Sequence, residues 1–502
     1  MNELQILGLI AIPVLLWLYW RERSKHRSTT ERMGRALQDM SGRLAVDAHT
    51  GLLTPAGFDV RLEQEVARVG RTDGSLSILV VALDNFGLIS NGFDDAGAAQ
   101  VVRAVADRLV ECAGKGAAIA TLSSSEFVLM VSGGARIGTL LAGRIQTAFG
   151  RPFDVAQGNK SVYVSCSTGV AVYPEHGEPA RMVAHATLAL QKAQATEAGS
   201  FRLYEPAMAT QARDEAVLVQ ELRQAVAQGQ LELYFQPKID AASLQVTAAE
   251  SLVRWHHPTR GFVSPGVFIP LAERYGLIAA VGDWVIEAAC QAAAQWNRIG
   301  LRMRVAVNIS GHQMRQDNLV EKIVASLQAH GIEPSRFTCE ITETVAMEDT
   351  AATRLTFEKM GRAGLHVSID DFGTGYSSLA SLRQLPAAEL KIDRAFVVDL
   401  ETSEKSRTIA KSIIELARSL NLRVVAEGVE TIGQRDILVD LGCDDLQGFL
   451  FCMPVNAREI ERMATGSGAV HGAPAVFRDS LYATDFQGEL AGRASDLGAL
   501  RG

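Results

Sequence analysis

Carboxylate, amide and ammonium side chains recur in the second half of the chain where short apolar segments end. They are Glu250, Asn308, Glu340, Glu343, Asp370, Asp371, Lys391, Asp393, Glu427, Glu430 and Gln447. One such carboxylate alone more often caps a helix or forms a surface ion pair. Because buried strand ends favour apolar residues, a whole series of polar ones needs a reason. Carboxylate and amide oxygens are the ligands that the hard cations Mg²⁺ and Mn²⁺ prefer.

The adjacent residues Asp370 and Asp371 suit a site with two such ions, because one side chain can bridge both. Two ions about 3.5–4 Å apart can activate a water molecule and stabilise the charge of an in-line displacement at phosphorus. Lys391 is expected one strand away, where it can orient the attacking water or take its proton. No Cys or His belongs to the set, which argues against zinc.

The segments that carry these residues read as eight short strands separated by helices. The strands are expected within 231–239, 247–255, 304–310, 337–343, 365–373, 388–393, 423–430 and 445–452, and helical stretches include 283–300, 318–330 and 406–420. Eight strands that alternate with helices predict an α/β fold, a (β/α)8 TIM-like barrel. The polar residues then fall at the carboxyl ends of its strands, where barrels build their active sites.

Residues 213–465 resemble an EAL-type cyclic-di-GMP phosphodiesterase domain. Glu250-Ser251-Leu252 stands where the family has Glu-Ala-Leu. The other motifs are NIS at Asn308, EITE from Glu340, IDDFGTGYSSL from Ile369, KID from Lys391, AEGVET from Ala426 and LQGFLF from Leu446. The resemblance implies that the cyclic dinucleotide is opened to linear 5′-pGpG, with effects on motility and biofilm formation. Ser251, the one departure, faces away from the metals if strand alternation holds.

The resemblance also implies a role for each matching residue. The first metal would be held by Glu250, Asn308, Glu340 and Asp370, and the second by Asp370, Asp371 and Glu427, with Asp393 nearby. The residues closest to the chemistry would be Glu250, Lys391, which assists the attacking water, and Glu343, which steadies the DDFGTGYSS loop. Ligand-binding positions are matched by Gln236 and Arg254, with Arg254 suited to a phosphate, and Gln447 matches a water-contacting position.

Residues 47–205 alternate strand-like runs (76–83, 127–131, 162–170) with helical ones (96–112, 137–149), which predicts helices packed against a sheet. They resemble a GGDEF (diguanylate cyclase) domain that has lost cyclase residues. The opening motif is matched by Asp47, Thr50, Gly51 and Leu52. The signature hairpin, however, reads Ser123-Ser124-Ser125-Glu126-Phe127, so that serines replace two glycines and a carboxylate.

Further cyclase positions of this domain are replaced as well. Ala82 stands where the first metal-binding Asp belongs, and Ser90 and Ala99 replace guanine-contacting residues. Gly114 and Ala117 occupy the inhibitory R-x-x-D site. The comparison with the family therefore implies no cyclisation and leaves GTP binding open. A regulatory or dimerisation module and an inert spacer both remain as interpretations.

Residues 1–20 are predicted to be a transmembrane anchor. The stretch from Leu4 to Trp20 carries no charge, and at about 1.5 Å per residue it reaches about 25 Å, the short end of a membrane span. The basic residues that follow directly, Arg21, Arg23, Lys25 and Arg27, predict a single-pass protein of the bacterial inner membrane with its domains in the cytoplasm. A cleaved signal peptide is the alternative, which Glu3 and the lack of a small-x-small site disfavour.

Three further segments are expected around the domains. Residues 21–46 read as a juxtamembrane helix, in which Met33, Leu37, Met40 and Leu44 have the spacing of either a dimerising stalk or an ordinary amphipathic helix. Residues 206–230 read as a linker helix, and 466–502 as a flexible tail. A homodimer is the expected assembly.

The composition of the 502 residues excludes several classes of protein. With 47% hydrophobic and 21% charged residues, the chain is neither disordered nor collagen-like. A net charge of -8 indicates no domain-wide basic surface for duplex nucleic acid. Six scattered cysteines fit a reducing compartment. The main prediction is a membrane-anchored phosphodiesterase dependent on Mg²⁺ or Mn²⁺. The alternative is a non-catalytic cyclic-di-GMP receptor, while Ser125 and Ala82 argue against a bifunctional cyclase–phosphodiesterase.

Overall fold

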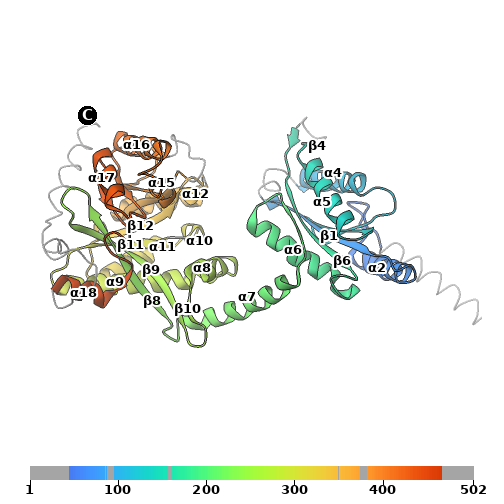
Figure 1. Cartoon of the computed structure of the whole chain (residues 1–502), viewed down its shortest axis with the longest axis horizontal. Coiled ribbons are helices and arrows are strands. Elements are labelled where there is room, and N and C mark those ends of the chain that lie inside the picture. The colour runs from blue at the N-terminus through green and yellow to red at the C-terminus, as the bar shows by residue number, and fades with distance from the viewer. Residues whose placement is uncertain are drawn as a thin grey trace, which may run out of the picture. The chain divides into compact units, whose positions relative to one another are not determined.

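The computed structural model describes residues 45–84, 86–87, 95–155, 160–348, 350–373 and 382–465. They form two compact units, divided between Asp214 and Glu215 (Figure 1). No helix within these ranges is long and apolar enough to cross a membrane. The predicted anchor, tail and most of the juxtamembrane helix lie outside the described residues. Residues 45–46, at the end of the predicted juxtamembrane helix, are not helical, since they form a turn and a β-bridge to Leu53.

The first unit is a five-stranded sheet with helices on both faces, as predicted. Its strand order is β2 (Ala118–Thr121), β3 (Glu126–Ser132), β1 (Leu76–Leu83), β6 (Cys166–Tyr173) and β7 (Phe201–Leu203). The helices are α2 (Pro55–Val69) and α6 (Met182–Thr196) on one face, and α4 (Asp95–Ala113) and α5 (Ala135–Phe149) on the other. All eight residues of β1 are buried, which is why this central strand is apolar apart from Ser77.

The strand expected over 162–170 is divided in the structure. Its first residue ends β5 (Lys160–Val162), which pairs with β4 (Phe153–Val155) in a separate hairpin, and β6 begins only at Cys166. Helix α7 (Pro206–Ala225) occupies most of the linker predicted over 206–230. Its apolar residues from Leu218 to Ala225 pack into the core of the second unit.

The second unit contains a closed ring of eight strands, which confirms the TIM-like barrel. In order they are β8 (Leu231–Asp240), β9 (Val246–His257), β11 (Arg304–Asn308), β12 (Phe337–Thr342), β13 (His366–Phe372), β14 (Glu389–Ile392), β15 (Arg423–Ala426) and β16 (Asp445–Leu446). The ring closes because β8 pairs with both β9 and β16. The short strands β10 (Gly261–Val263) and β17 (Val455–Asn456) extend it at β9 and β8.

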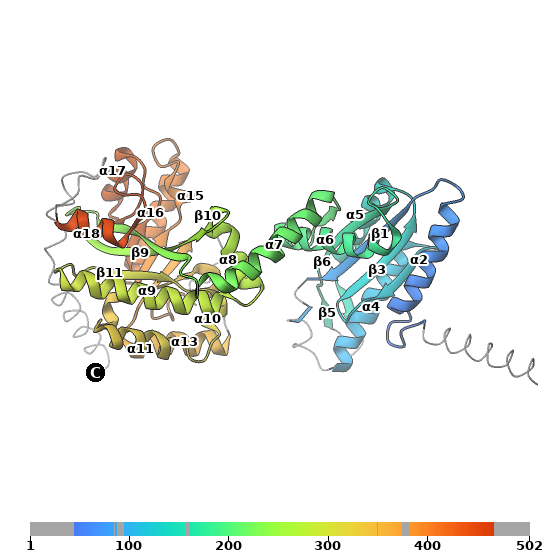
Figure 2. The ribbon, with the colours of Figure 1, turned by 90° about the horizontal axis from the view of Figure 1, so that it is seen from below.

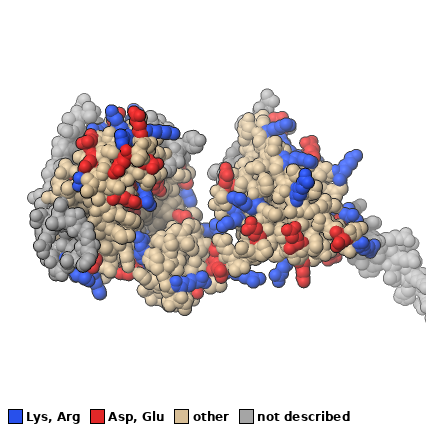
Figure 3. Space-filling model, viewed as in Figure 1, with Lys and Arg blue, Asp and Glu red and all other residues tan. Residues whose placement is uncertain are grey.

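Helices surround this ring. They are α8 (Pro265–Arg274), α9 (Ile278–Arg298), α10 (Gly311–Met314), α11 (Leu319–His330), α12 (Glu343–Ala346), α13 (Ala351–Ala363), α15 (Arg394–Val397), α16 (Glu404–Ser419), α17 (Ile432–Leu441) and α18 (Ala457–Thr465). Figure 2 shows α9 beside α11, and α11 beside α13. On the face shown in Figure 3, acidic and basic side chains are interspersed over both units.

The expected alternation of strands and helices is wrong at β8. This strand runs antiparallel to both of its ring neighbours and is joined to β9 through residues 241–245, with no helix between them. Only parallel neighbours need a long crossover connection, so a turn is sufficient here. As a result, the amino-terminal half of β8 lies at the mouth where the parallel strands end, with Gln236 opposite Glu250.

Candidate active site

The predicted metal ligands come together at the mouth formed by the carboxyl ends of the parallel strands. Asn308 is in register with Glu340, and its Nδ2 donates to Glu250 Oε1 at 2.8 Å. Asp370, Asp371 and Glu427 each offer an oxygen, and the three oxygens lie within 4.8 Å of one another. Residues from β9, β11, β12, β13 and the end of β15 thus share one acidic centre, as the barrel prediction required.

Glu250 does not end its strand, contrary to the prediction, because β9 continues to His257. The pairing of β9 with β11 nevertheless stops at Ser251, and the rest of β9 pairs with β8 and β10. Glu250 therefore ends the part of β9 that belongs to the barrel. Ser251 lies on the opposite side of the strand, where its buried hydroxyl donates to the Ala306 carbonyl at 2.7 Å.

Asp370 and Asp371 are adjacent, although neighbouring strand residues normally point to opposite sides. The backbone solves this problem at Asp371, which has a left-handed φ of 54° at the end of β13, where the register with β14 shifts. The Asp371 N–H then donates to Asp370 Oδ1 at 2.9 Å. Such a conformation costs about 1–3 kcal/mol in a non-glycine residue, and here it accompanies the approach of the two carboxylates.

Lys391 lies at the centre of the carboxylates and is almost completely buried. Its Nζ is 2.5 Å from Glu427 Oε1, 3.0 Å from Asp370 Oδ1, 3.3 Å from Glu340 Oε1 and 3.7 Å from Glu250 Oε2. Burial by itself would lower the pKa of Lys391, but these carboxylates more than offset it and raise the pKa well above its ordinary value. The side chain is therefore an ammonium in the structure as described.

Three carboxyl groups of the site, those of Glu340, Asp371 and Glu427, have raised pKa values. Burial, followed by Asp370 and Asp393, raises the pKa of Asp371 to about 6, and burial raises that of Glu427 to about 8 despite Lys391. The pKa of Glu340 is raised by burial and by Glu250. Its Oε2 is buried and has no hydrogen-bond partner among the described residues. Crowded carboxylates and an orphaned oxygen are the donor set that fits hard divalent cations.

Glu343 makes the contact predicted for it. It is the first residue of α12, and its Oε2 accepts a hydrogen bond from the N–H of Gly373 at 2.7 Å. Gly373 has φ of 101°, a conformation that favours glycine. The start of the DDFGTGYSS loop is thereby attached to α12. Residues 374–381 of that loop lie outside the described part of the chain.

Two of the three predicted substrate contacts lie in the mouth. Gln447 Nε2 donates to Glu250 Oε2 at 2.6 Å and to Gln236 Oε1 at 3.3 Å. Both glutamines line a pocket of about 260 Å³ that also includes Leu252 and Phe449. Arg254 is not among its lining residues. It lies on the extension of β9, 5.5 Å from the centre of the Tyr234 ring.

Asp393 is the predicted ligand to which the structure gives a different contact. Its side chain accepts from the Ala395 N–H at 2.9 Å and caps α15. It still contributes to the raised pKa of Asp371. Glu430, another strand-end residue, pairs with Arg394 at 2.7 Å at the surface. For these two residues the structure supports the ordinary cap and ion-pair interpretations.

Lys238 and Glu389 are buried polar residues of this barrel that the sequence analysis missed. Lys238 Nζ lies 2.7 Å from Glu340 Oε1 and 2.7 Å from Glu389 Oε1. Neither residue lies at the carboxyl end of its strand, so a search confined to those ends overlooks both. A search for charged residues two positions from a predicted site residue on the same strand finds Lys238 from Gln236 and Glu389 from Lys391.

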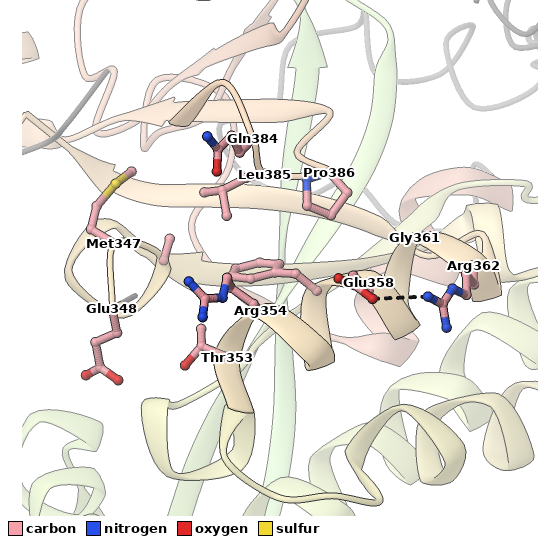
Figure 4. Close-up of a pocket in the computed structure, with 12 residues that line it drawn as sticks. Met347, Glu348, Thr353, Arg354, Glu358, Gly361, Arg362, Gln384, Leu385 and Pro386 are labelled. Atoms are coloured by element: carbon pink, nitrogen blue, oxygen red, sulfur yellow. Dashed lines mark hydrogen bonds and ion pairs between the residues drawn. The ribbon is translucent and has the colours of Figure 1, made fainter. Parts of the chain in front are cut away.

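A larger pocket, of about 580 Å³, lies elsewhere on the second unit, between α12, α13 and residues 384–386. Figure 4 shows Leu385 and Pro386 on one side and Arg354 and Thr353 on the other, with Glu358 paired to Arg362 at 3.0 Å. None of the predicted site residues lines it. Its size alone therefore does not make it the site of chemistry.

The first unit has a pocket of about 1010 Å³ where the resemblance places the cyclase chemistry, lined by Asp47, Ala99 and Ser123–Ser125 among others. The Asp47 carboxylate accepts from the N–H and the hydroxyl of Thr50 at 2.8 and 2.7 Å. Asp84 accepts from the Ser167 hydroxyl at 2.8 Å and from the Gly199 N–H at 2.9 Å. Ala82 is buried between β3 and β6. Both carboxylates are thus engaged by protein groups.

Comparison with known protein families identifies both units. The model described as "Diguanylate cyclase, GGDEF domain" matches residues 44–200, and the model described as "EAL domain" matches residues 219–454.

Two curated proteins of Pseudomonas aeruginosa are among the similar ones. The chain is 36% identical to "Bifunctional diguanylate cyclase/cyclic di-GMP phosphodiesterase MucR" over 406 residues, 80% of this chain and 59% of the relative. It is 31% identical to "Cyclic di-GMP phosphodiesterase NbdA" over 458 residues, 89% of this chain and 58% of the relative. The chain thus spans somewhat more than half the length of these relatives.

A solved structure titled "PaMucR Phosphodiesterase, c-di-GMP complex" is 44% identical. The alignment covers 49% of this chain and 99% of that one, with a TM-score of 0.47. From the two family matches, residues 44–200 form a GGDEF domain, residues 219–454 form an EAL domain, and the chain belongs to the proteins that combine the two.

Proposed function

We propose that this chain is a cyclic-di-GMP phosphodiesterase that opens its substrate to linear 5′-pGpG and so lowers the second messenger. The observation that carries the proposal is the convergence of Asp370, Asp371 and Glu427 at the mouth of the barrel, where Lys391 pairs with Asp370 and Glu427. The names of the relatives MucR and NbdA support the choice of substrate. The companion expectation of effects on motility and biofilm formation follows from this activity.

Two divalent cations, Mg²⁺ or Mn²⁺, would be held by the oxygen donors of the mouth. The first would be shared by Glu250, Asn308, Glu340 and Asp370, and the second by Asp370, Asp371 and Glu427. When bound, such ions lower the pKa of water and neutralise phosphoryl charge. Asp393 would lie near the second cation, with its Oδ1 engaged as the cap of α15.

Lys391 would orient the attacking water through its ammonium group. A lysine at this place could either orient the water or take its proton. An ammonium donates hydrogen bonds and cannot accept a proton, so the raised pKa favours orientation. Glu343 would hold the DDFGTGYSS loop in place through Gly373. Gln236, Gln447 and, at the outer rim, Arg254 would bind the dinucleotide.

Product analysis with the full chain tests this proposal. The purified protein with Mn²⁺ should convert cyclic di-GMP to pGpG, and Glu250→Ala should abolish turnover without unfolding the barrel. If the protein binds cyclic di-GMP with Mn²⁺ present yet forms no pGpG, the proposal fails and a non-catalytic receptor is the better description.

We infer in addition that the GGDEF domain does not form cyclic di-GMP from GTP, although MucR is named as bifunctional. Ala82 and Ser125 provide no carboxylate, and Asp47 and Asp84 are engaged by Thr50, Ser167 and Gly199. The domain would instead regulate or dimerise the enzyme. Incubation of the full chain with GTP and Mg²⁺ should give no cyclic di-GMP.

The membrane anchor at residues 1–20, the inner-membrane location and the homodimer are part of the same proposal and follow from sequence alone. Fractionation of cells that express the chain with and without residues 1–20 tests the anchor. The full chain should sediment with inner membranes, and the shortened chain should not.

A further inference from the structure

Lys238 crosses the interior of the barrel beneath the acidic mouth. It lies two residues beyond Gln236 on β8, on the same face of the strand, and only 1% of its surface is exposed. Its Nζ reaches Glu340 on β12 and Glu389 on β14, each at 2.7 Å. These strands are each three places from β8 around the ring, in opposite directions.

Glu389 holds the ammonium of Lys238 from below. The Ser368 hydroxyl donates to the same carboxylate oxygen at 2.9 Å, and Arg304 lies 3.8 Å from the other oxygen. Glu389 is itself 1% exposed, so its position is set by these contacts and by its place in β14. The Lys238 ammonium is therefore fixed between two carboxylates that belong to different strands.

Glu340 is bound asymmetrically as a consequence. Lys238 at 2.7 Å and Lys391 at 3.3 Å both approach Oε1, whereas the buried Oε2 has no hydrogen-bond partner among the described residues. A buried carboxylate oxygen without a partner is costly unless a cation or donor reaches it. The asymmetry leaves one oxygen of Glu340 for a cation in the mouth.

We propose that Lys238 is a positioning residue of the metal centre, which holds Glu340 by one oxygen so that the other is directed to a divalent cation. Its partner Glu389 has a definite part in this arrangement. A lone ammonium next to a ligand would repel the cation, but the neighbouring carboxylate cancels that charge at close range. The pair thus orients Glu340 without weakening the attraction of the mouth for Mg²⁺ or Mn²⁺. This inference rests on the proposed metal-dependent function and adds a residue to it.

The variant Lys238→Met shows whether Lys238 orients Glu340 or acts only through its positive charge, because the two roles change the affinity for Mn²⁺ in opposite directions. If Lys238 acted only through its charge, its removal would tighten the binding of a cation. If it orients Glu340, removal weakens Mn²⁺ binding by about 10- to 100-fold, the range typical of residues that support metal ligands. The measurement is a titration of the full chain with Mn²⁺, followed by electron paramagnetic resonance of the free ion.

A second variant keeps the test decisive if Lys238→Met unfolds the barrel. Lys238→Met/Glu389→Gln removes both charges, which disturbs a buried site far less than removing one partner. It should fold and still bind Mn²⁺ at least about tenfold more weakly. The control is Arg423→Met/Asp445→Asn, which removes another pair in the same barrel, 2.8 Å apart, that touches none of the proposed ligands. Its Mn²⁺ affinity should remain within about twofold of the parent's.

The outcomes separate this inference from the proposed function. Unchanged or tighter Mn²⁺ binding by either Lys238 variant overturns the inference while pGpG formation by the parent still supports the phosphodiesterase. A parent that binds Mn²⁺ but forms no pGpG sinks the phosphodiesterase and leaves Lys238 to be judged by the titration. If the parent binds no Mn²⁺, or if both Lys238 variants unfold while the control folds, Lys238 is a structural residue and the inference is wrong.

Discussion

The carboxylates of the GGDEF domain and those of the EAL domain in this chain have opposite environments. In the GGDEF domain, Asp47 and Asp84 accept hydrogen bonds from neighbouring protein groups. In the EAL domain, Asp370, Asp371 and Glu427 crowd together, Lys391 pairs with Asp370 and Glu427, and the pKa values of Asp371 and Glu427 are raised. Satisfied carboxylates contribute to the stability of a fold, whereas crowded ones cost stability until a cation arrives.

The difference shows that a fold and its chemistry are separable within one polypeptide. The GGDEF domain retains its five-stranded sheet with Ala82 and Ser125 at cyclase positions, because its stability comes from the apolar cores on the two faces of the sheet. The acidic residues at the mouth of the EAL domain add little to the stability of that domain. Substitution of a carboxylate at the mouth of the EAL domain should therefore lower activity more than stability, and substitution of a hydrogen-bonded carboxylate in the GGDEF domain should lower stability more than activity.

The largest effect is expected from Asp370→Asn. This change removes a charge from a ligand that would be shared by both cations, and turnover should fall by on the order of 10³-fold. Thermal unfolding without metal should shift little, because the lost repulsion from Asp371 and Glu427 is offset by the lost ion pair with Lys391, whose Nζ lies 3.0 Å from Asp370 Oδ1. The rate of pGpG formation and the midpoint temperature check the two halves of this prediction. Retained turnover would remove Asp370 from the metal centre.

Removal of metal gives the next largest effect, and its pH dependence has a definite sign. The carboxyls of Asp371 and Glu427 have pKa values raised to about 6 and about 8 on folding, above ordinary values near 4. Their contribution to stability is therefore lost as pH rises from about 4 through 6 and 8 in the absence of metal. Since Mn²⁺ needs ionised ligands, it should stabilise the EAL domain more at pH 8 than at pH 5. At 100-fold excess over Kd, bound Mn²⁺ stabilises the folded domain by about 2.7 kcal/mol relative to the metal-free protein at the same pH.

Calorimetric scans of the full chain with Mn²⁺ and with a chelator measure this difference. The unfolding of the GGDEF domain serves as an internal control, because it should not respond to the metal. A shift of equal size at both pH values would contradict the ionisation of Asp371 and Glu427 as its cause.

Asp84→Asn in the GGDEF domain should lower stability and leave the hydrolysis of cyclic di-GMP unchanged. The carboxylate accepts from Ser167 and Gly199, and an amide can replace only one of these acceptors, so the unfolding free energy of this domain should fall by about 1–3 kcal/mol. Denaturant unfolding provides the measurement. Hydrolysis of cyclic di-GMP per folded molecule should stay the same, and a loss as large as that of Asp370→Asn would abolish the contrast between the domains.

Ser251→Ala should have the smallest effect. The hydroxyl donates to the Ala306 carbonyl on the side of β9 away from Glu250, so its loss should cost about 0.5–1.5 kcal/mol of stability. Turnover should remain within about twofold of the parent's. A tenfold change in the rate would show that the Glu-Ser-Leu motif itself tunes the metal centre.

Much of this organisation could be predicted from sequence. The strand predicted over 76–83 has the same bounds as β1 in the structure. Asn308, Glu340, Asp370 and Lys391 meet at the mouth of the barrel, as expected for residues at the carboxyl ends of its strands. The prediction succeeded because parallel strands bring their carboxyl ends to one edge. For Asp393 the sequence did not reveal that one carboxylate oxygen caps α15, since a cap and a metal ligand use the same residue type at the same place after a strand.

By itself, the sequence determined which segments are buried strands and which polar residues end them, because the alternation and length of apolar runs report burial directly. Tertiary structure alone decided that β8 runs against its neighbours, that the backbone turns at Asp371, and that Lys238 lies between Glu340 and Glu389. Apolar periodicity is identical for a strand read in either direction. The direction of a strand and the partner of a buried charge depend on pairing between residues far apart in the chain, which emerges only when the ring closes.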